Sequence, residues 1–154
     1  MSFEKKIEQL YLKLPSAPVP LGAYVSCVKI DSYCLTSGQM PFWNNELKYK
    51  GKVGKDLSEK EAYEASKICA LNCLSVIKNI VGSLDNVVKI IKITGYVNSA
   101  PGFNQQPKVL NGASDLISEI FGDAGKHARV AVGASELPYD AAVELEMIVK
   151  VKST

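Results

Sequence analysis

The sequence predicts an α+β protein in which helices cover one face of a mixed β-sheet. Segments with helical spacing of apolar residues and segments rich in β-branched residues follow one another as helix, two strands, helix, strand, helix and two strands. The few helices of such a chain can cover only one face of its sheet. The last two strand segments also alternate apolar residues with charged or small ones, as expected when the two faces differ.

The length and composition predict a single domain over residues 1–154, in which residues 1–20 form an N-terminal helix and a proline-rich connector. A chain of 154 residues with 47% hydrophobic content can bury a core without metal or disulfide support. No apolar run approaches the roughly 20 residues of a membrane span, and the N-terminus lacks the apolar core of a signal peptide. We expect a soluble, cytoplasmic protein with no membrane partner.

The first half of the chain contains recognisable helix ends and strands. Residues 3–12 have helical spacing, and the prolines of "LPSAPVP" end that helix. The segments "AYVSCVKID" and "YCLTSGQM" predict two strands joined by a tight turn. A capping box from Ser58 to Glu61 begins a long helix that ends at Gly82. The predicted buried stripe of this helix contains Ala65, Cys69, Cys73, Val76 and Ile80.

The second half predicts a strand over 87–98, a helix over 109–122, and strands over 128–135 and 141–151. A turn through Pro138 and Asp140 separates the last two strands. The helix is expected to bury Leu116, Ile117, Ile120 and Phe121. The strand side chains expected to face the helices are Val130, Val132, Ala134, Val143, Leu145, Met147 and Val149.

The opposite face of these two strands is then expected to carry charged and small side chains. These are Arg129, Ala131, Gly133, Ser135, Glu144 and Glu146. Such a face is open to water or covered by another subunit. Because several apolar residues would otherwise be exposed, we favour a homo-oligomer whose site lies between subunits.

The cysteines and lysines suggest no metal site and no nucleic-acid partner. The four cysteines include no CxxC pair, and a single histidine leaves too few ligands for a common zinc site. We expect Cys27, Cys34, Cys69 and Cys73 to be reduced core residues. The net charge is only +2. Lys48, Lys50 and Lys52 would share one face of a strand, and a solvated hairpin edge explains them better than a nucleic-acid patch does.

One arginine and one histidine stand close together near the C-terminus. Of the 18 lysine and arginine residues, only Arg129 is arginine, and His127, the only histidine, precedes it by two residues. A guanidinium is planar and always charged, and it can hold a carboxylate or phosphate through two parallel hydrogen bonds. Arg129 is therefore a candidate anion clamp, with a structural ion pair as the alternative.

Several segments together resemble a known family over nearly the whole chain. The segments "YVSCVKIDSYCLTSGQMP", "VLNGASDL" and "ARVAVGASELPYDAAVELEMI" resemble the RidA/YjgF family of reactive intermediate imine deaminases. The segments "GKVGKDLS", "CALNCL", "FNQQPKVLNGASDL" and "GKHARVAVG" are more similar to a subgroup labelled chorismate-mutase-like endoribonuclease, or L-PSP. The resemblance implies a chorismate-mutase-like α+β fold and a homotrimer with clefts between neighbouring subunits.

The resemblance also implies an activity and a set of site residues. The activity is hydrolytic deamination of 2-imino or 2-enamino acids to 2-keto acids and ammonia, without metal or cofactor. Arg129 would hold the substrate carboxylate, and Glu144 and the main chain of Ala131 would contact the water. The pocket would be lined by Tyr24, Ser37, Gly38 and Asn111. An imine is already electrophilic, so a fixed carboxylate, a positioned water and a proton carrier suffice.

Two departures leave alternatives open. Many family deaminases have cysteine where Ala131 stands, which argues against thiol chemistry here. His127 belongs to the pattern of the subgroup and is either a pocket acid/base or substrate selector, or a structural histidine at the strand entrance. The longer "NSAPGFNQQPKV" loop could also reshape the pocket.

Two other functions also remain open. One is a non-catalytic trimer that binds a small carboxylate or a protein, since a clamp binds a stable keto acid as readily as an imine. The other is an endoribonuclease, but one histidine rules out a two-histidine acid/base mechanism and the scattered lysines make a weak RNA track.

Overall fold

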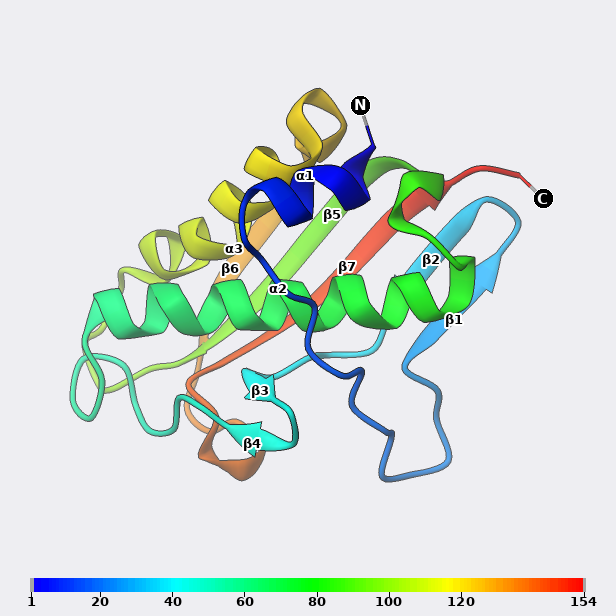
Figure 1. Ribbon diagram of the computed structural model, residues 1–154. Coiled ribbons are helices and arrows are strands. Elements are labelled where there is room, and N and C mark those ends of the chain that lie inside the picture. Colours follow the sequence, from blue (N-terminus) through cyan, green and yellow to red (C-terminus); the bar gives the residue numbers. More distant parts are fainter. Residues whose placement is uncertain (1, 154) are drawn as a thin grey trace.

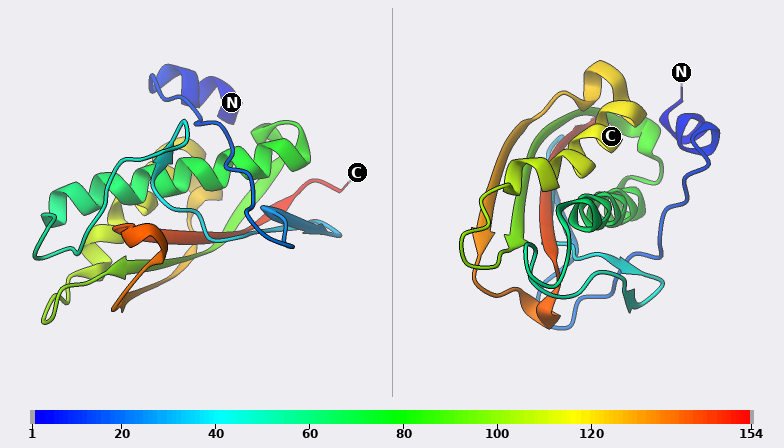
Figure 2. Two further views of the ribbon diagram at one scale, coloured as in Figure 1. Left: turned by 90° about the horizontal axis from the view of Figure 1, so that it is seen from below. Right: turned by 90° about the vertical axis from the view of Figure 1, so that its left-hand side faces the viewer.

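The computed structural model describes residues 2–153 and contains a five-stranded mixed sheet with helices on one face (Figures 1 and 2). The strand order is β1-β2-β7-β5-β6, and only β5 and β6 run parallel. The strands are β1 (Cys27–Ile30), β2 (Tyr33–Thr36), β5 (Val87–Asn98), β6 (Ala128–Ala134) and β7 (Val143–Val151). A separate two-residue hairpin pairs β3 (Phe42–Trp43) with β4 (Glu46–Leu47). The predicted fold class is confirmed.

The helical layer consists of α2 (Glu59–Val81) and α3 (Gln106–Phe121), which lie side by side on the sheet, with α1 (Phe3–Gln9) beyond them (Figure 2). The predicted capping box is present at the start of α2. The Ser58 hydroxyl accepts from the Glu61 N–H at 3.1 Å, and the Glu61 carboxylate accepts from the Ser58 N–H at 2.7 Å. Gly82, with φ +81°, ends the helix.

The two long helices approach each other closely at Gly112. A Cβ on this residue would overlap the main-chain carbonyl of Tyr63 on α2, so only glycine fits. The buried hydroxyl of Ser66 also joins the helices, because it accepts from the Ala113 N–H at 2.9 Å. These contacts fix the position of α3 on the sheet and therefore of the side chains that α3 carries toward β6.

The core lies between the helices and the sheet, largely as the sequence predicts. The predicted inward residues of α3 and β7 are all buried. On α2, Ile80 is an exception, since it is half exposed and faces residues 17–27 of the connector.

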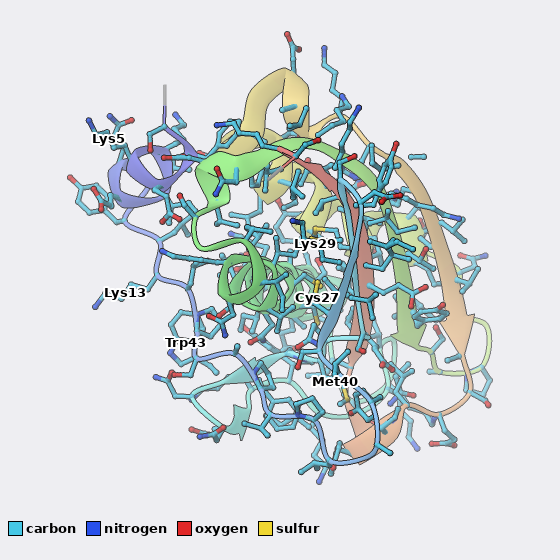
Figure 3. All side chains as sticks on the ribbon, turned by 90° about the vertical axis from the view of Figure 1, so that its right-hand side faces the viewer. Lys5, Lys13, Cys27, Lys29, Met40 and Trp43 are labelled. Atoms are coloured by element: carbon cyan, nitrogen blue, oxygen red, sulfur yellow. The ribbon has the colours of Figure 1, made fainter. Side chains whose placement is uncertain are left out.

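The four cysteines are buried and reduced, which confirms their predicted place in the core. Figure 3 shows Cys27 between the sheet and α2. Burial raises the pKa of the Cys27 and Cys73 thiols to about 12, so both stay protonated at neutral pH.

The lysine-rich segment differs from the prediction. Residues 48–52 follow the β3–β4 hairpin and do not form a strand face. Lys52 points inward, where its ammonium donates to Asn98 Oδ1 at 3.0 Å and to the Ser135 carbonyl, and pairs with Glu136 at 3.3 Å. Lys52 therefore connects its own loop to the end of β5 and to the residues that follow β6. Of the three lysines, only Lys48 and Lys50 are exposed.

The two faces of β6 are the reverse of the prediction. Parallel pairing with β5 places Arg129 beside the buried Ile93 and Val130 beside Thr94. Arg129 therefore faces the helical layer, whereas Val130 and Val132 are 42% and 41% exposed on the other face. Alternation along a strand shows that two faces differ, but at an edge strand with small residues the partner strand decides which one is covered.

The sheet face without helices, called the open face below, carries many apolar side chains. They include Val28, Ile30, Leu35, Val130 and Val132, each at least 40% exposed. The half-buried Glu144 and Glu146 of β7 lie on the same face, next to Tyr96 and Thr94 of β5. Contiguous apolar residues of this kind are typical of a surface that meets another protein surface.

None of the helices within residues 2–153 has both the length and the apolar composition needed to cross a membrane.

Candidate functional site

Arg129 lies at the edge of the sheet, where β6 meets α3. Its Nη1 donates to Asn111 Oδ1 at 2.9 Å and to Ser114 Oγ at 3.1 Å, and its Nη2 donates to the Pro107 carbonyl at 3.3 Å. These three α3 residues follow each other at intervals of four and three and so share one helix face. A guanidinium has five N–H groups, so two remain for a ligand.

Within residues 2–153, no carboxylate forms an ion pair with Arg129. Across the described residues, 2–153, the ion pairs all involve lysine, and none includes Arg129. The alternative of a structural ion pair therefore finds no partner in this part of the chain. Neutral oxygens orient the guanidinium and leave its charge available to an anion, which favours the clamp.

His127 completes a hydrogen-bond chain that ends at Arg129. Its Nδ1 lies 2.6 Å from the Gly125 carbonyl and its Nε2 lies 2.9 Å from Ser114 Oγ. A carbonyl can only accept, so we assign the proton to Nδ1, and neutral Nε2 then accepts from the Ser114 hydroxyl. The same hydroxyl oxygen accepts from Arg129. Every donor in this series of hydrogen bonds, from Arg129 through Ser114 to His127, faces an acceptor.

The surroundings of His127 keep it neutral. Burial lowers the pKa of its imidazole, and the positive charges of Arg129 and Lys89 lower the pKa further, against an opposing effect of the Gly125 hydrogen bond. Of the two interpretations of His127, the structure favours the structural one. Both ring nitrogens bind the protein, and neither is free to exchange a proton with a ligand.

A second group of predicted residues lies at the open face, around Glu144. Gly38 lies directly beneath the Glu144 carboxylate, and a Cβ at Gly38 would overlap it. The Ser37 hydroxyl donates to the Val25 carbonyl at 2.6 Å and so holds the segment that carries Tyr24. Burial raises the pKa of Glu144, and repulsion from Glu146 raises that pKa further. Glu144 can therefore hold a proton closer to neutral pH than an exposed glutamate can.

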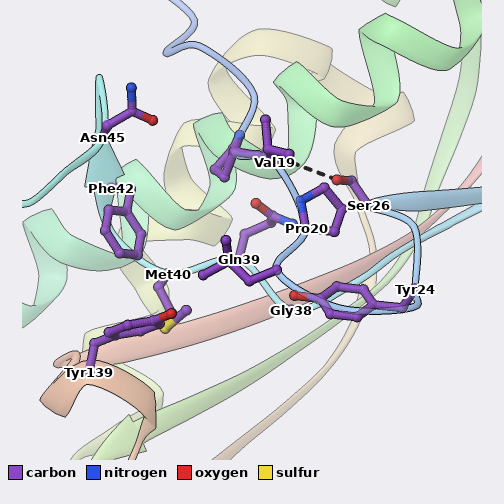
Figure 4. Close-up of a pocket in the computed structure, with 12 residues that line it drawn as sticks. Val19, Pro20, Tyr24, Ser26, Gly38, Gln39, Met40, Phe42, Asn45 and Tyr139 are labelled. Atoms are coloured by element: carbon purple, nitrogen blue, oxygen red, sulfur yellow. Dashed lines mark hydrogen bonds between the residues drawn. The ribbon is translucent and has the colours of Figure 1, made fainter.

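A pocket of ≈ 290 Å³ opens beside this group (Figure 4). Gly38 and Tyr24 belong to its lining, and Tyr139 of the β6–β7 turn forms another part. The connector that follows α1 crosses over α2, where the Ser75 hydroxyl donates to the Pro15 carbonyl at 2.7 Å (Figure 1). The connector then continues to Val19 and Pro20, which close one side of the pocket.

The structure thus separates the predicted site residues into two groups. One group faces the helical layer at the β6 edge and contains Asn111, His127, Arg129 and Ala131. The other lies at the open face and contains Tyr24, Ser37, Gly38 and Glu144. The expectation that Arg129 and Glu144 share one sheet face is wrong, because Arg129 aligns with buried Ile93 whereas Glu144 aligns with Tyr96 and Val132.

Some contributing residues were not predicted from the sequence. Ser114 and the Pro107 carbonyl bind Arg129, and Tyr96 donates to Glu146 Oε1 at 3.3 Å. The spacing of Ser114 from Asn111 along the predicted helix was the available signal for Ser114, whereas Pro107 precedes that helix as predicted and belongs to α3 only in the structure.

The part of the chain that the structure describes contains no cluster of histidine, cysteine, aspartate or glutamate suited to a metal ion. The fold and the two groups of site residues define an α+β protein with a candidate anion site at a sheet edge. The family model described as "YjgF/chorismate mutase-like, putative endoribonuclease" matches residues 4–150. The chain belongs to this family.

Individual relatives agree with this assignment. Protein TCP17 of Trypanosoma cruzi is 39% identical over 148 residues, which are 96% of this chain and 92% of that protein. The crystal structure of a "putative endoribonuclease" from Shewanella oneidensis is 30% identical, with a TM-score of 0.95, covering 98% of this chain and 100% of that one. A 2-iminobutanoate/2-iminopropanoate deaminase from Dermatophagoides farinae is 29% identical over 143 residues, 92% of this chain and 95% of that protein.

Proposed function

We propose that this protein hydrolyses reactive 2-imino and 2-enamino acids to 2-keto acids and ammonia. The observation that carries the proposal is the combination of Arg129, oriented by neutral partners and without a carboxylate, with Glu144, whose pKa is raised. The first suits the carboxylate that all these substrates share, and the second suits the proton transfers of hydrolysis. The family includes a relative named as an imine deaminase.

The proposed site lies between neighbouring copies of a homotrimer. Within one copy, Arg129 and Glu144 lie on opposite sides of the sheet, so we do not expect one small molecule to contact both. The apolar open face also requires a cover. A cyclic arrangement that places the β6 edge of one copy over the open face of the next satisfies both requirements.

In the proposed reaction the residues of the chain position the substrate and carry protons. Arg129 holds the carboxylate of the iminium acid through its remaining N–H groups. Glu144 takes a proton from the attacking water while the oxygen bonds to the imine carbon, and returns it to the nitrogen as the carbon–nitrogen bond breaks. The remaining hydroxyl proton passes to the departing ammonia as the carbonyl forms. A 2-iminium acid and water thereby give a 2-keto acid and ammonium. An enamino acid first takes a proton at its β carbon and becomes the iminium acid.

The direct test measures imine hydrolysis. Imines are generated in situ from several amino acids by an amino-acid oxidase and trapped with semicarbazide, with and without the protein. Wild type should divert the imine to keto acid, whereas Arg129→Ala should not. Arg129→Lys should keep the fold and lose most of the activity, because an ammonium keeps the charge without the two parallel hydrogen bonds. If wild type is inactive but stabilised by pyruvate or 2-ketobutyrate, the protein is a carboxylate-binding protein instead.

A mixing experiment tests whether each site combines two copies. Arg129→Ala and Glu144→Gln should each be inactive alone. After the two are unfolded and refolded together, random assembly of trimers should restore about a quarter of the wild-type sites, because one site in each mixed trimer receives both intact residues. Equal activity of the mixture and the separate variants would contradict a shared site.

An endoribonuclease activity is not favoured by the structure. The single histidine is bound at both ring nitrogens, so it has no free nitrogen for a histidine-based acid/base cleavage of RNA.

A further inference from the structure

We infer that the preferred substrates of this protein carry an aromatic or similarly bulky apolar side chain, which occupies the ≈ 290 Å³ pocket beside Gly38. The inference rests on the proposed function and adds a substrate class to it. The pocket lining is mostly apolar, and none of its side chains, all within the described residues, carries a formal charge. It includes Leu21, Tyr24, Met40, Phe42 and Tyr139, together with the polar Ser26, Gln39 and Asn45.

The pocket adjoins the position proposed for the reacting carbon. Gly38 lines the pocket and also lies under the Glu144 carboxylate, so one residue separates the two spaces. A substrate carbon placed at Glu144 therefore has its side chain at the pocket entrance.

The composition of the pocket suits a flat apolar group. Figure 4 shows Phe42, Met40 and Tyr139 on one side and Tyr24 on the other. Phe42 and Tyr139 already meet edge to face, with ring centroids 6.0 Å apart, which is a geometry that a further ring can extend. The thioether of Met40 adapts to ligands of different shape. A methyl or ethyl group would leave most of this apolar surface in contact with water.

The backbone at Tyr139 supplies an independent argument. Tyr139 has φ 58° and ψ 15°, a left-handed conformation that costs free energy for a residue with a bulky side chain. The following Asp140 is also left-handed, and it is tied by Asn98 Nδ2, which donates to its Oδ1 at 3.0 Å, and by the Gly51 N–H, which donates to its carbonyl at 2.7 Å.

The contact with Phe42 covers only part of Tyr139. The residue is still 56% exposed, and asparagine would adopt the same turn with less strain. What the tyrosine adds is an aromatic surface at the pocket. Strained backbone that presents an exposed side chain to a cavity is a recurring property of ligand sites.

The test compares imines of different size in one assay. We expect kcat/KM for the imine from phenylalanine to exceed that for the imine from alanine by about tenfold or more in wild type. Tyr139→Asn, which keeps the left-handed turn and removes the ring, should lower this ratio about tenfold, whereas Tyr139→Phe should preserve it. Tyr11→Asn is a matched control, because Tyr11 is also left-handed, at φ 53°, and is 94% exposed outside this pocket.

Binding measured without turnover distinguishes a failure of the proposed substrate class from a failure of the proposed function. Thermal stabilisation by phenylpyruvate should exceed that by pyruvate in wild type and in Tyr11→Asn, but not in Tyr139→Asn. If wild type hydrolyses imines but prefers the one from alanine, or if Tyr139→Asn leaves the ratio unchanged, the pocket does not select the substrate and the proposed function stands. If wild type hydrolyses no imine, the proposed function is overturned. In that case equal stabilisation by both keto acids overturns the substrate class as well.

Discussion

The Arg129 guanidinium is bound to α3 through two side chains and one main-chain carbonyl, none of which carries a charge. Charged partners would orient an arginine equally well, but they would compete with an anionic ligand. The neutral partners avoid that competition, and the hydrogen-bond chain through Ser114 to His127 fixes one of them in turn. We therefore expect His127 to be a positioning residue, which would act on a ligand only through Ser114 and Arg129.

The chain of hydrogen bonds predicts the effect of removing Ser114. Ser114→Ala should leave Arg129 with less orientation and His127 with an unpaired Nε2, and should lower kcat/KM for imines about fivefold, mainly through KM. Ser118→Ala is the control, because Ser118 lies one turn further along α3 and is exposed. Equal kinetics of Ser114→Ala and Ser118→Ala would show that the orientation of Arg129 does not depend on its hydrogen bond to Ser114.

His127 also predicts a pH dependence of stability. Because its pKa is lowered in the folded state, the folded protein binds fewer protons than the unfolded chain between the folded pKa and the unfolded value near 6.5. The stabilisation by neutral His127 is complete above about pH 6.5 and is lost as the pH falls through the folded pKa.

This pH dependence can be measured by urea unfolding between pH 7.5 and 5. The free energy of unfolding of wild type should fall more steeply on acidification than that of His127→Asn. Glu144 has a raised pKa and affects stability in the opposite direction, but it is present in both proteins and cancels in the difference. Parallel curves for the two proteins would show that His127 is not held neutral by the fold.

At the scale of elements, the packing of α2 against α3 determines where Asn111 and Ser114 meet β6. Gly112→Ala should lower the free energy of unfolding by about 2–3 kcal/mol, because the added methyl group overlaps the Tyr63 carbonyl and forces the helices apart. Denaturant unfolding measures this change. A loss below about 0.5 kcal/mol would mean that the helices separate at little cost and that their contact does not fix the site.

The sequence predicts individual elements better than it predicts their faces. The strand over 87–98 and the capped helix from Ser58 to Gly82 are found as predicted, because β-branched content and capping residues are local signals. The faces of β6 could not be predicted, because the choice depends on the parallel register with β5. Lys52 was misassigned for a related reason, since its partners Asn98 and Ser135 are distant in sequence.

The site residues show the same limit. Arg129 stands out in the composition as the only arginine, and the residues implied by the family resemblance lie in two coherent groups. The sequence could not show that these groups lie on opposite faces of one copy. The sequence also could not predict the left-handed conformation of Tyr139. The neighbouring Asp140 is held by hydrogen bonds from Asn98 and Gly51, which are distant in sequence.

At the scale of the whole molecule, the open face and the β6 edge each carry only one part of the proposed site. Val132 is 41% exposed on the open face and lies beside Tyr96, which in turn lies beside Glu144. Val132→Glu should change the free energy of unfolding of a single copy little, because water already reaches this side chain. In the proposed assembly the same carboxylate would be buried without a partner, which is strongly unfavourable.

We therefore expect Val132→Glu to be folded, monomeric and inactive toward imines, because Arg129 of one copy can no longer reach Glu144 of another. Sedimentation analysis and circular dichroism, together with the imine assay, measure the three properties. Tyr11→Glu is the control, since Tyr11 follows α1 in the helical layer and is 94% exposed, and its substitution should preserve both assembly and activity. A monomeric but fully active Val132→Glu would place the whole site within one copy and overturn the shared cleft.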